Sequence, residues 1–116
     1  MTIDVEKCSE IDCLVAVLSL GLCVAIETKD LTIQDAEDYL FSPYTMRVLG
    51  LNGASSEAVD LVHLGTELEN VQRIVPEHLQ DSLDDMRSLA SAILKAPSRS
   101  SEPKSKWLQV GSAELP

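Results

Sequence analysis

The residue types best suited to chemistry in this chain are His63 and Glu67, four positions apart, with Asp60 three positions before the histidine. On a helix these three side chains share one flank. A zinc site needs three or four protein ligands, but His78 is the only other histidine and no cysteine lies nearby in sequence. The pattern therefore favours an interhelical hydrogen bond or ion pair over a metal site.

Catalytic signatures are missing from the rest of the sequence. It contains no glycine-rich phosphate loop, no GxSxG turn and no nucleophile–base pairing. General acid–base catalysis needs two carboxyl groups in contrasting environments, whereas the acids here lie on predicted solvent faces. We therefore expect no enzyme activity, cofactor or metal, and a hydrolase using His63 and Glu67 is the least favoured interpretation.

Acidic side chains are the most prominent chemical feature of the 116 residues, which carry a net charge of −10. Through Lys95 there are 17 acidic against 6 basic residues. This charge disfavours nucleic acid, whose phosphates would be repelled, and favours a basic protein partner. The alternative is that the charge serves solubility alone. The candidate partner-binding residues are Asp35, Glu37, Asp38, Tyr44, Glu67, Asp81, Asp84 and Asp85.

The longest apolar run, Cys13 to Ile26, has 14 residues, short of the roughly 18–20 that a membrane span needs. Acidic rather than basic residues precede it, which is against a signal peptide. Cys8, Cys13 and Cys23 lack CxxC spacing, so they indicate neither a disulfide framework nor a zinc site. We expect a cytoplasmic protein without a membrane segment, in which this run forms a helix buried on nearly all sides.

Helix starts and breaks divide the chain into about five helices. Ser9 is a predicted N-cap of the first helix, and Thr32 with Asp35 predicts a short second helix to about Phe41. Ser42-Pro43 predicts a third start, and Asn52-Gly53 its end. The fourth helix starts near Ser55 or Ser56 and the fifth after Pro76. Their apolar stripes are Leu61, Leu64, Leu68, Val71 and Val75, then Leu79, Leu83, Met86, Ala90 and Ile93.

These patterns predict an all-α fold, a compact bundle of about five helices around a central apolar N-terminal helix. The predicted domain covers residues 1–96. Residues 97–116 form a polar, Pro- and Ser-rich tail of irregular structure. Gly65, inside the fourth helix, indicates a close helix–helix approach.

Two segments, Phe41-Ser42-Pro43-Tyr44-Thr45 and His63-Leu64-Gly65-Thr66-Glu67-Leu68-Glu69, lie in a stretch that resembles a family of small acidic bacterial proteins of uncharacterised function. The resemblance runs from about Glu10 to Lys95 and excludes the tail. Families of this kind often include immunity proteins, which neutralise a toxin made by the same or a neighbouring cell. The resemblance implies that role for this chain.

The leading hypothesis is therefore an immunity (antitoxin-like) protein that covers the basic active-site cleft of a cognate toxin with an acidic helical face. The alternative is a helical adaptor or a homodimer that uses the apolar stripes of the fourth and fifth helices between subunits.

Overall fold

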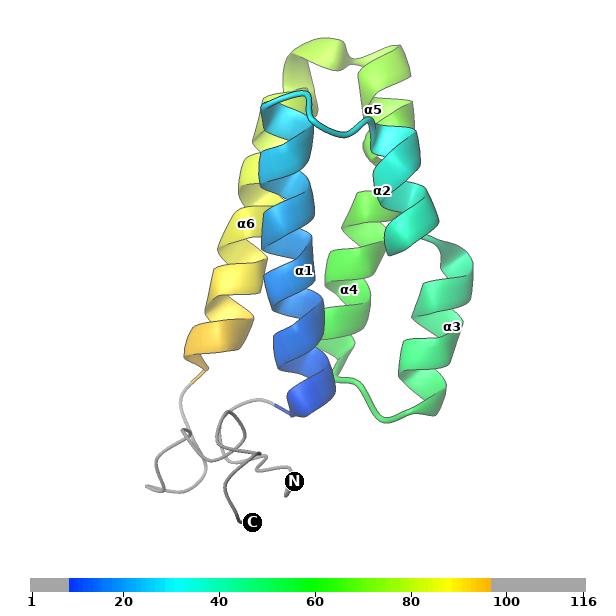
Figure 1. The fold of residues 1–116 in the computed structure, drawn as a ribbon, viewed down its shortest axis with the longest axis vertical. Helices are drawn as coiled ribbons and strands as arrows, with labels where there is room; N and C mark the ends of the chain where they lie inside the picture. The colour runs from blue at the N-terminus through cyan, green and yellow to red at the C-terminus, as the bar shows by residue number, and fades with distance from the viewer. Residues whose placement is uncertain (1–8, 97–116) are drawn as a thin grey trace.

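The computed structural model of the chain describes residues 9–96, which form six α-helices, one 3-10 helix and no strand (Figure 1). The all-α prediction is confirmed, with more helices than the five expected. Residues 1–8 and the predicted tail, residues 97–116, lie outside the described part. The elements are α1 (Glu10–Glu27), α2 (Ile33–Tyr39), α3 (Pro43–Leu51), α4 (Ser56–Thr66), α5 (Leu68–Ile74), η1 (Pro76–His78) and α6 (Leu79–Lys95).

Each of the first four helices begins at the side-chain cap that the sequence predicts. The hydroxyl oxygens of Ser9, Thr32, Ser42 and Ser55 accept a backbone N–H three residues further on, at 3.0 to 3.1 Å. At α2 the Asp35 carboxylate reciprocates by accepting the backbone N–H of the cap residue. Such caps satisfy N–H groups that a helix start leaves without partners, so these four starts follow from local sequence.

The predicted fourth helix is two helices, because the chain turns at Glu67 between α4 and α5. The hydroxyl of Thr66 donates to the carbonyl oxygen of His63 at 2.6 Å. The backbone N–H of Glu67 bonds to the carbonyl oxygen of Leu64, one residue short of the α-helical partner. A side-chain hydroxyl that donates to a helix carbonyl competes with the backbone N–H that would otherwise bond to that carbonyl. This competition occurs where α4 ends.

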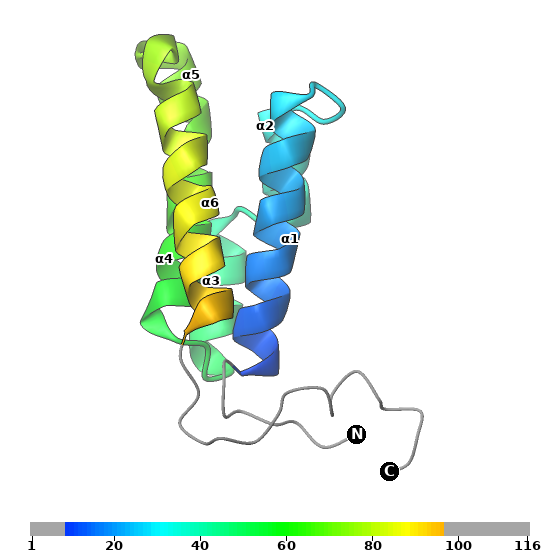
Figure 2. The ribbon, with the colours of Figure 1, turned by 90° about the vertical axis from the view of Figure 1, so that its left-hand side faces the viewer.

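Helices α1 and α6 run antiparallel and side by side in both views, and α4 packs against both of them (Figures 1 and 2). The predicted stripes of α4–α5 and α6 meet in the core, where the most deeply buried large side chains gather. These include Phe41, Leu61, Val62, Leu68, Leu83 and Met86. The centres of both stripes are therefore packed within the protein.

The prediction that the N-terminal helix is covered on nearly all sides is wrong. One face of α1, which includes Val15, Ala16 and Cys23, is buried. Four large apolar side chains elsewhere on this helix are about half exposed. Helices α6, α4 and α2 are its packing partners. Because α3 packs against α4 instead, too few elements surround α1 to cover its outer face.

Two contacts between distant parts of the chain position α4. Asp12, a buried carboxylate in the first turn of α1, accepts the backbone N–H of Ser55 at 3.0 Å. Gly65 lies against the ring of Phe41, and a Cβ atom at position 65 would overlap the ring carbons. The neighbour of Gly65 is therefore not a helix, as predicted, but the ring of Phe41, which lies in the link between α2 and α3.

Candidate protein-binding surfaces

His63 pairs with Glu67, four residues further on at the end of α4, and not with a side chain of another helix, as predicted. His63 Nε2 lies 3.6 Å from Glu67 Oε2, and both side chains are half exposed. Within residues 9–96, no three His, Cys, Asp or Glu side chains are placed to hold a metal ion. The pair is therefore a solvent-exposed contact across the helix end, worth at most about 1 kcal/mol.

The cysteines offer little nucleophilic chemistry. Cys23 is a free, fully buried thiol, and burial, with a smaller contribution from the Glu27 charge, raises its pKa to about 11. The reactive form is the thiolate, so Cys23 stays protonated at neutral pH. Cys13 is disulfide-bonded, a correction to the prediction, since irregular spacing does not exclude a single bridge. Cys8 lies outside the described residues.

One group of carboxylates joins α2 to α5. The pKa of Glu37 is raised above its ordinary value of 4.5. Burial contributes most, followed by the negative charge of Glu69, a side-chain hydrogen bond to Glu69 and the charge of Asp38. We call Glu37, Asp38 and Glu69 the α2–α5 acidic cluster. Glu69 was not among the predicted site residues. Arg73, four residues further along α5, donates to Asn70 at 2.7 Å.

Basic side chains do little to balance these acids. Among residues 9–96 there are 15 acidic and five Lys or Arg residues, and the one Lys- or Arg-to-carboxylate ion pair in that range joins Arg87 to Glu27 on other helices. Asp38 accepts a hydrogen bond from the uncharged Gln34 at 3.2 Å. The α2–α5 acidic cluster therefore keeps like charges together without a cationic partner from the described part of the chain.

Two exposed tyrosines flank the α2–α3 junction. The exposed fraction is 72% for Tyr39 and 68% for Tyr44. Tyrosine is enriched in the energetically important centres of protein interfaces. The sequence proposed Tyr44 as a binding residue, and its exposure on the helix that follows α2 is compatible with that role.

The remaining predicted acids, Asp81, Asp84 and Asp85, are exposed on α6. Asp81 lies 3.5 Å from His78, and Asp84 accepts from Gln80 at 3.0 Å. Helices α2 and α6 lie on opposite sides of α1 (Figure 1). The predicted acidic residues therefore form two separate groups. Asp35 and Glu67 belong to neither, since Asp35 caps α2 and Glu67 contacts His63.

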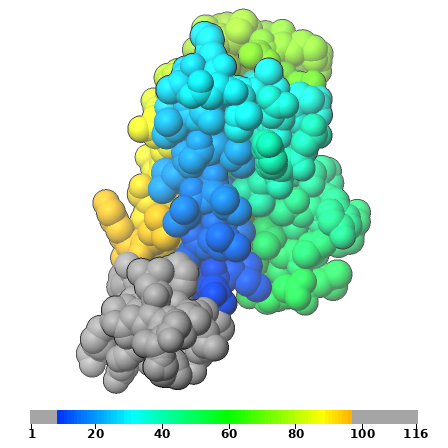
Figure 3. All heavy atoms as spheres, viewed as in Figure 1, coloured from blue at the N-terminus to red at the C-terminus, as the bar shows by residue number. Residues whose placement is uncertain are grey.

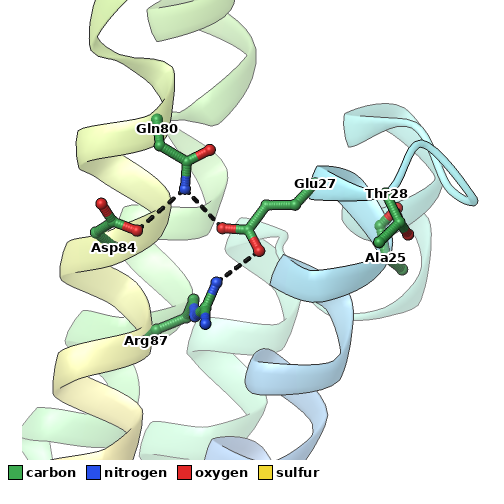
Figure 4. Close-up of polar contacts among 6 residues, drawn as sticks. All are labelled: Ala25, Glu27, Thr28, Gln80, Asp84 and Arg87. Carbon is green, nitrogen blue, oxygen red and sulfur yellow. Dashed lines mark hydrogen bonds and ion pairs between the residues drawn. The ribbon is translucent and has the colours of Figure 1, made fainter.

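A polar network between α1 and α6 was not foreseen. Glu27 Oε1 accepts from Arg87 Nη1 at 2.6 Å, and Glu27 Oε2 accepts from Gln80 Nε2 at 2.7 Å (Figure 4). Gln80 also donates to Asp84, so part of the α6 charge is tied into this network. The partners are 53 and 60 residues apart in sequence, and no spacing rule detects contacts of that range.

Comparison with known proteins adds a family. The family described as Protein of unknown function (DUF3969) matches residues 6–109. The chain belongs to this family. The family match extends past the last helix, which corrects the expectation that the resemblance ends near Lys95. No curated protein and no solved structure matches. None of the helices within residues 9–96 combines the length and hydropathy needed to cross a lipid bilayer.

Proposed function

We propose that this member of the family is a bacterial immunity (antitoxin-like) protein, which inhibits a cognate toxin by binding it. The proposed contact is the α2–α5 acidic cluster together with the exposed Tyr39 and Tyr44 at the α2–α3 junction, placed in a basic cleft of the toxin. The action requires binding alone and no catalytic step.

The observation that carries the proposal is the grouping of Glu37, Asp38 and Glu69, with which no Lys or Arg of residues 9–96 forms an ion pair. Perturbed carboxyl groups gather at functional sites more often than elsewhere. A basic partner would supply the missing positive charge, which would lower the pKa of Glu37 and speed the encounter. The α6 acids support the role less well, because Asp84 is engaged with Gln80 in the network around Glu27.

The test begins with the tagged full-length chain as bait in an extract of its source cells at low salt. The captured protein is identified by mass spectrometry, purified, and expressed alone and together with the chain. Growth arrest that co-expression relieves is the expected result. If the tagged chain captures no protein, or captures one whose expression does not slow growth, the immunity role is overturned.

Two charge-reversal variants locate the contact. One is Glu37→Lys with Asp38→Lys and Glu69→Lys; the matched control is Asp81→Lys with Asp84→Lys and Asp85→Lys, which changes the net charge equally. We expect the first variant to slow association with the captured protein about tenfold or more and to flatten its salt dependence. We expect the control to change the rate far less. Equal effects would indicate a general charge effect, and the reverse order would move the contact to α6.

Proton release gives an independent reading of the same contact. Titration calorimetry in two buffers of different ionisation enthalpy should detect protons released on binding near pH 5, because the partner lowers the pKa of Glu37. Glu37→Gln should release fewer protons. Equal release from both proteins would show that Glu37 is not in the interface.

A further inference from the structure

We propose that the exposed face of α1 is the docking site of the chain's own C-terminal segment, centred on Trp107. The face is formed by Leu14, Val17, Leu18 and Val24, which we call the α1 apolar stripe. The segment comprises residues 97–110, and its apolar residues Trp107, Leu108 and Val110 provide the contact.

The stripe contains no charged side chain. Its four side chains are 45–57% exposed, and their spacing of three, one and six residues keeps them on one side of the helix. Gly21, between Leu18 and Val24, is exposed, and a Cβ atom there would meet nothing within 4 Å. Helix α1 lies on the surface that faces the viewer in Figure 3. A contiguous apolar patch of this kind marks a surface that is covered by something.

The C-terminal segment starts in the right place and is long enough. Helix α6 ends at Lys95, beside the start of α1, because the two helices are antiparallel (Figures 1 and 2). From Ala96 to Trp107 an extended chain spans up to about 36 Å. The stripe from Leu14 to Val24 rises only about 15 Å along the helix. Trp107 can therefore reach any part of the stripe.

The chemistry of the segment complements the domain. Residues 97–110 contain three basic residues and one acidic residue, whereas the chain through Lys95 has a net charge of −11. The hydrophobic side chains of Trp107, Leu108 and Val110 follow the basic ones. The family match also continues to residue 109 and so includes Trp107, which places most of this segment within the shared domain.

A second copy of the chain is a poorer occupant. Stable interfaces bury about 800 Å² per partner, with roughly 20–30 residues a side, whereas the stripe has four large side chains that are already about half buried. Two chains of net charge −10 also repel each other. A tethered segment needs less contact area, because its effective concentration is in the millimolar range.

Trp107 is the only tryptophan of the chain, so its fluorescence reports the contact directly in the full-length protein. The stripe variant is Leu14→Gln with Leu18→Gln, which keeps helix propensity and charge. The control is Leu51→Gln, at an 80% exposed leucine on α3. Circular dichroism verifies that each variant is folded.

In the unmodified protein we expect blue-shifted emission and acrylamide quenching at least threefold slower than for free indole. The stripe variant should shift to the red and quench like free indole, while Leu51→Gln should match the unmodified protein. Rapid quenching in the unmodified protein would overturn the proposal. So would a protected Trp107 that the stripe variant leaves unchanged, or a dimer in light scattering that the stripe variant dissociates. None of these measurements depends on the proposed immunity role.

Discussion

At the scale of single residues, Gly65 has no room for a side chain because the Phe41 ring lies against it. We expect Gly65→Ala to lower the free energy of unfolding by about 1–3 kcal/mol, since overpacking outweighs the better helix propensity of alanine. Urea unfolding followed by circular dichroism measures the change. Gly50→Ala is the control, because a Cβ atom there meets nothing within 4 Å and the variant should gain up to about 1 kcal/mol. Equal effects at both positions would contradict the packing at Gly65.

Glu37 makes stability depend on pH. Its pKa is higher in the folded protein than the ordinary 4.5, so the folded state holds the proton more tightly than the unfolded chain. The stabilisation from protonation is full below pH 4.5 and is lost as the pH rises through the folded-state pKa. We expect Glu37→Gln to be more stable than the unmodified protein at pH 7, by about 0.5 kcal/mol.

The stability gain of Glu37→Gln over the unmodified protein should vanish below pH 4.5, the ordinary pKa of the carboxyl group. Urea titrations at pH 4 and pH 7 measure this difference. Glu77→Gln, an exposed acid on η1, controls for the loss of one negative charge. An identical gain in both variants at pH 7 would mean that net charge sets the effect, and not the burial of Glu37 or its contact with Glu69.

At the scale of elements, the end of α1 contains a left-handed residue that is not glycine. Lys29 has φ +65°, its N–H bonds to the carbonyl of Ile26, and the N–H of Asp30 bonds to that of Ala25. This is a Schellman motif, in which glycine is the favoured residue. Lys29→Gly should raise the free energy of unfolding by about 1 kcal/mol. Lys29→Ala removes the same charge but keeps Cβ, and a comparable gain from it would contradict a backbone origin.

The link between α1 and α6 depends on Glu27 and Arg87, whose side chains are 18% and 44% exposed. A double-mutant cycle with Glu27→Gln and Arg87→Met should give a coupling free energy of about 1 kcal/mol at low salt, because one partner is largely shielded from water. The coupling should decrease in 0.5 M salt. Additive effects of the two substitutions would show that the pair does not stabilise the packing of these helices.

At the scale of the whole molecule, 15 acidic against five Lys or Arg residues within residues 9–96 make the folded chain repel itself. We expect added sodium chloride to raise the melting temperature, because salt screens this repulsion. Asp81→Asn with Asp84→Asn and Asp85→Asn should melt higher at low salt and depend less on salt. Scanning calorimetry measures both, and a melting temperature that falls with salt would show that specific ion pairs outweigh the net charge.

Local sequence determined the starts of α1, α2, α3 and α4 and the break after α5. The caps at Ser9, Thr32, Ser42 and Ser55 act over three residues, and Pro76 interrupts the chain by its own geometry. Signals of this range are readable because the interacting groups are close in sequence. The buried stripes of α4–α5 and α6 were also predictable, since their periodicity is that of a helix with one covered face.

Tertiary structure decided which faces are covered and which charges meet. The apolar run in the sequence predicts an apolar helix. Whether each face of that helix is covered depends on how many other helices pack around it, and this packing leaves the α1 apolar stripe exposed. The approach of Glu37 to Glu69, the pairing of Glu27 with Arg87 and the packing of Phe41 on Gly65 join residues 24 to 60 positions apart. Such contacts depend on how the elements pack, because the energy of a side-chain contact depends on the distance between the atoms in space and not on their separation in sequence.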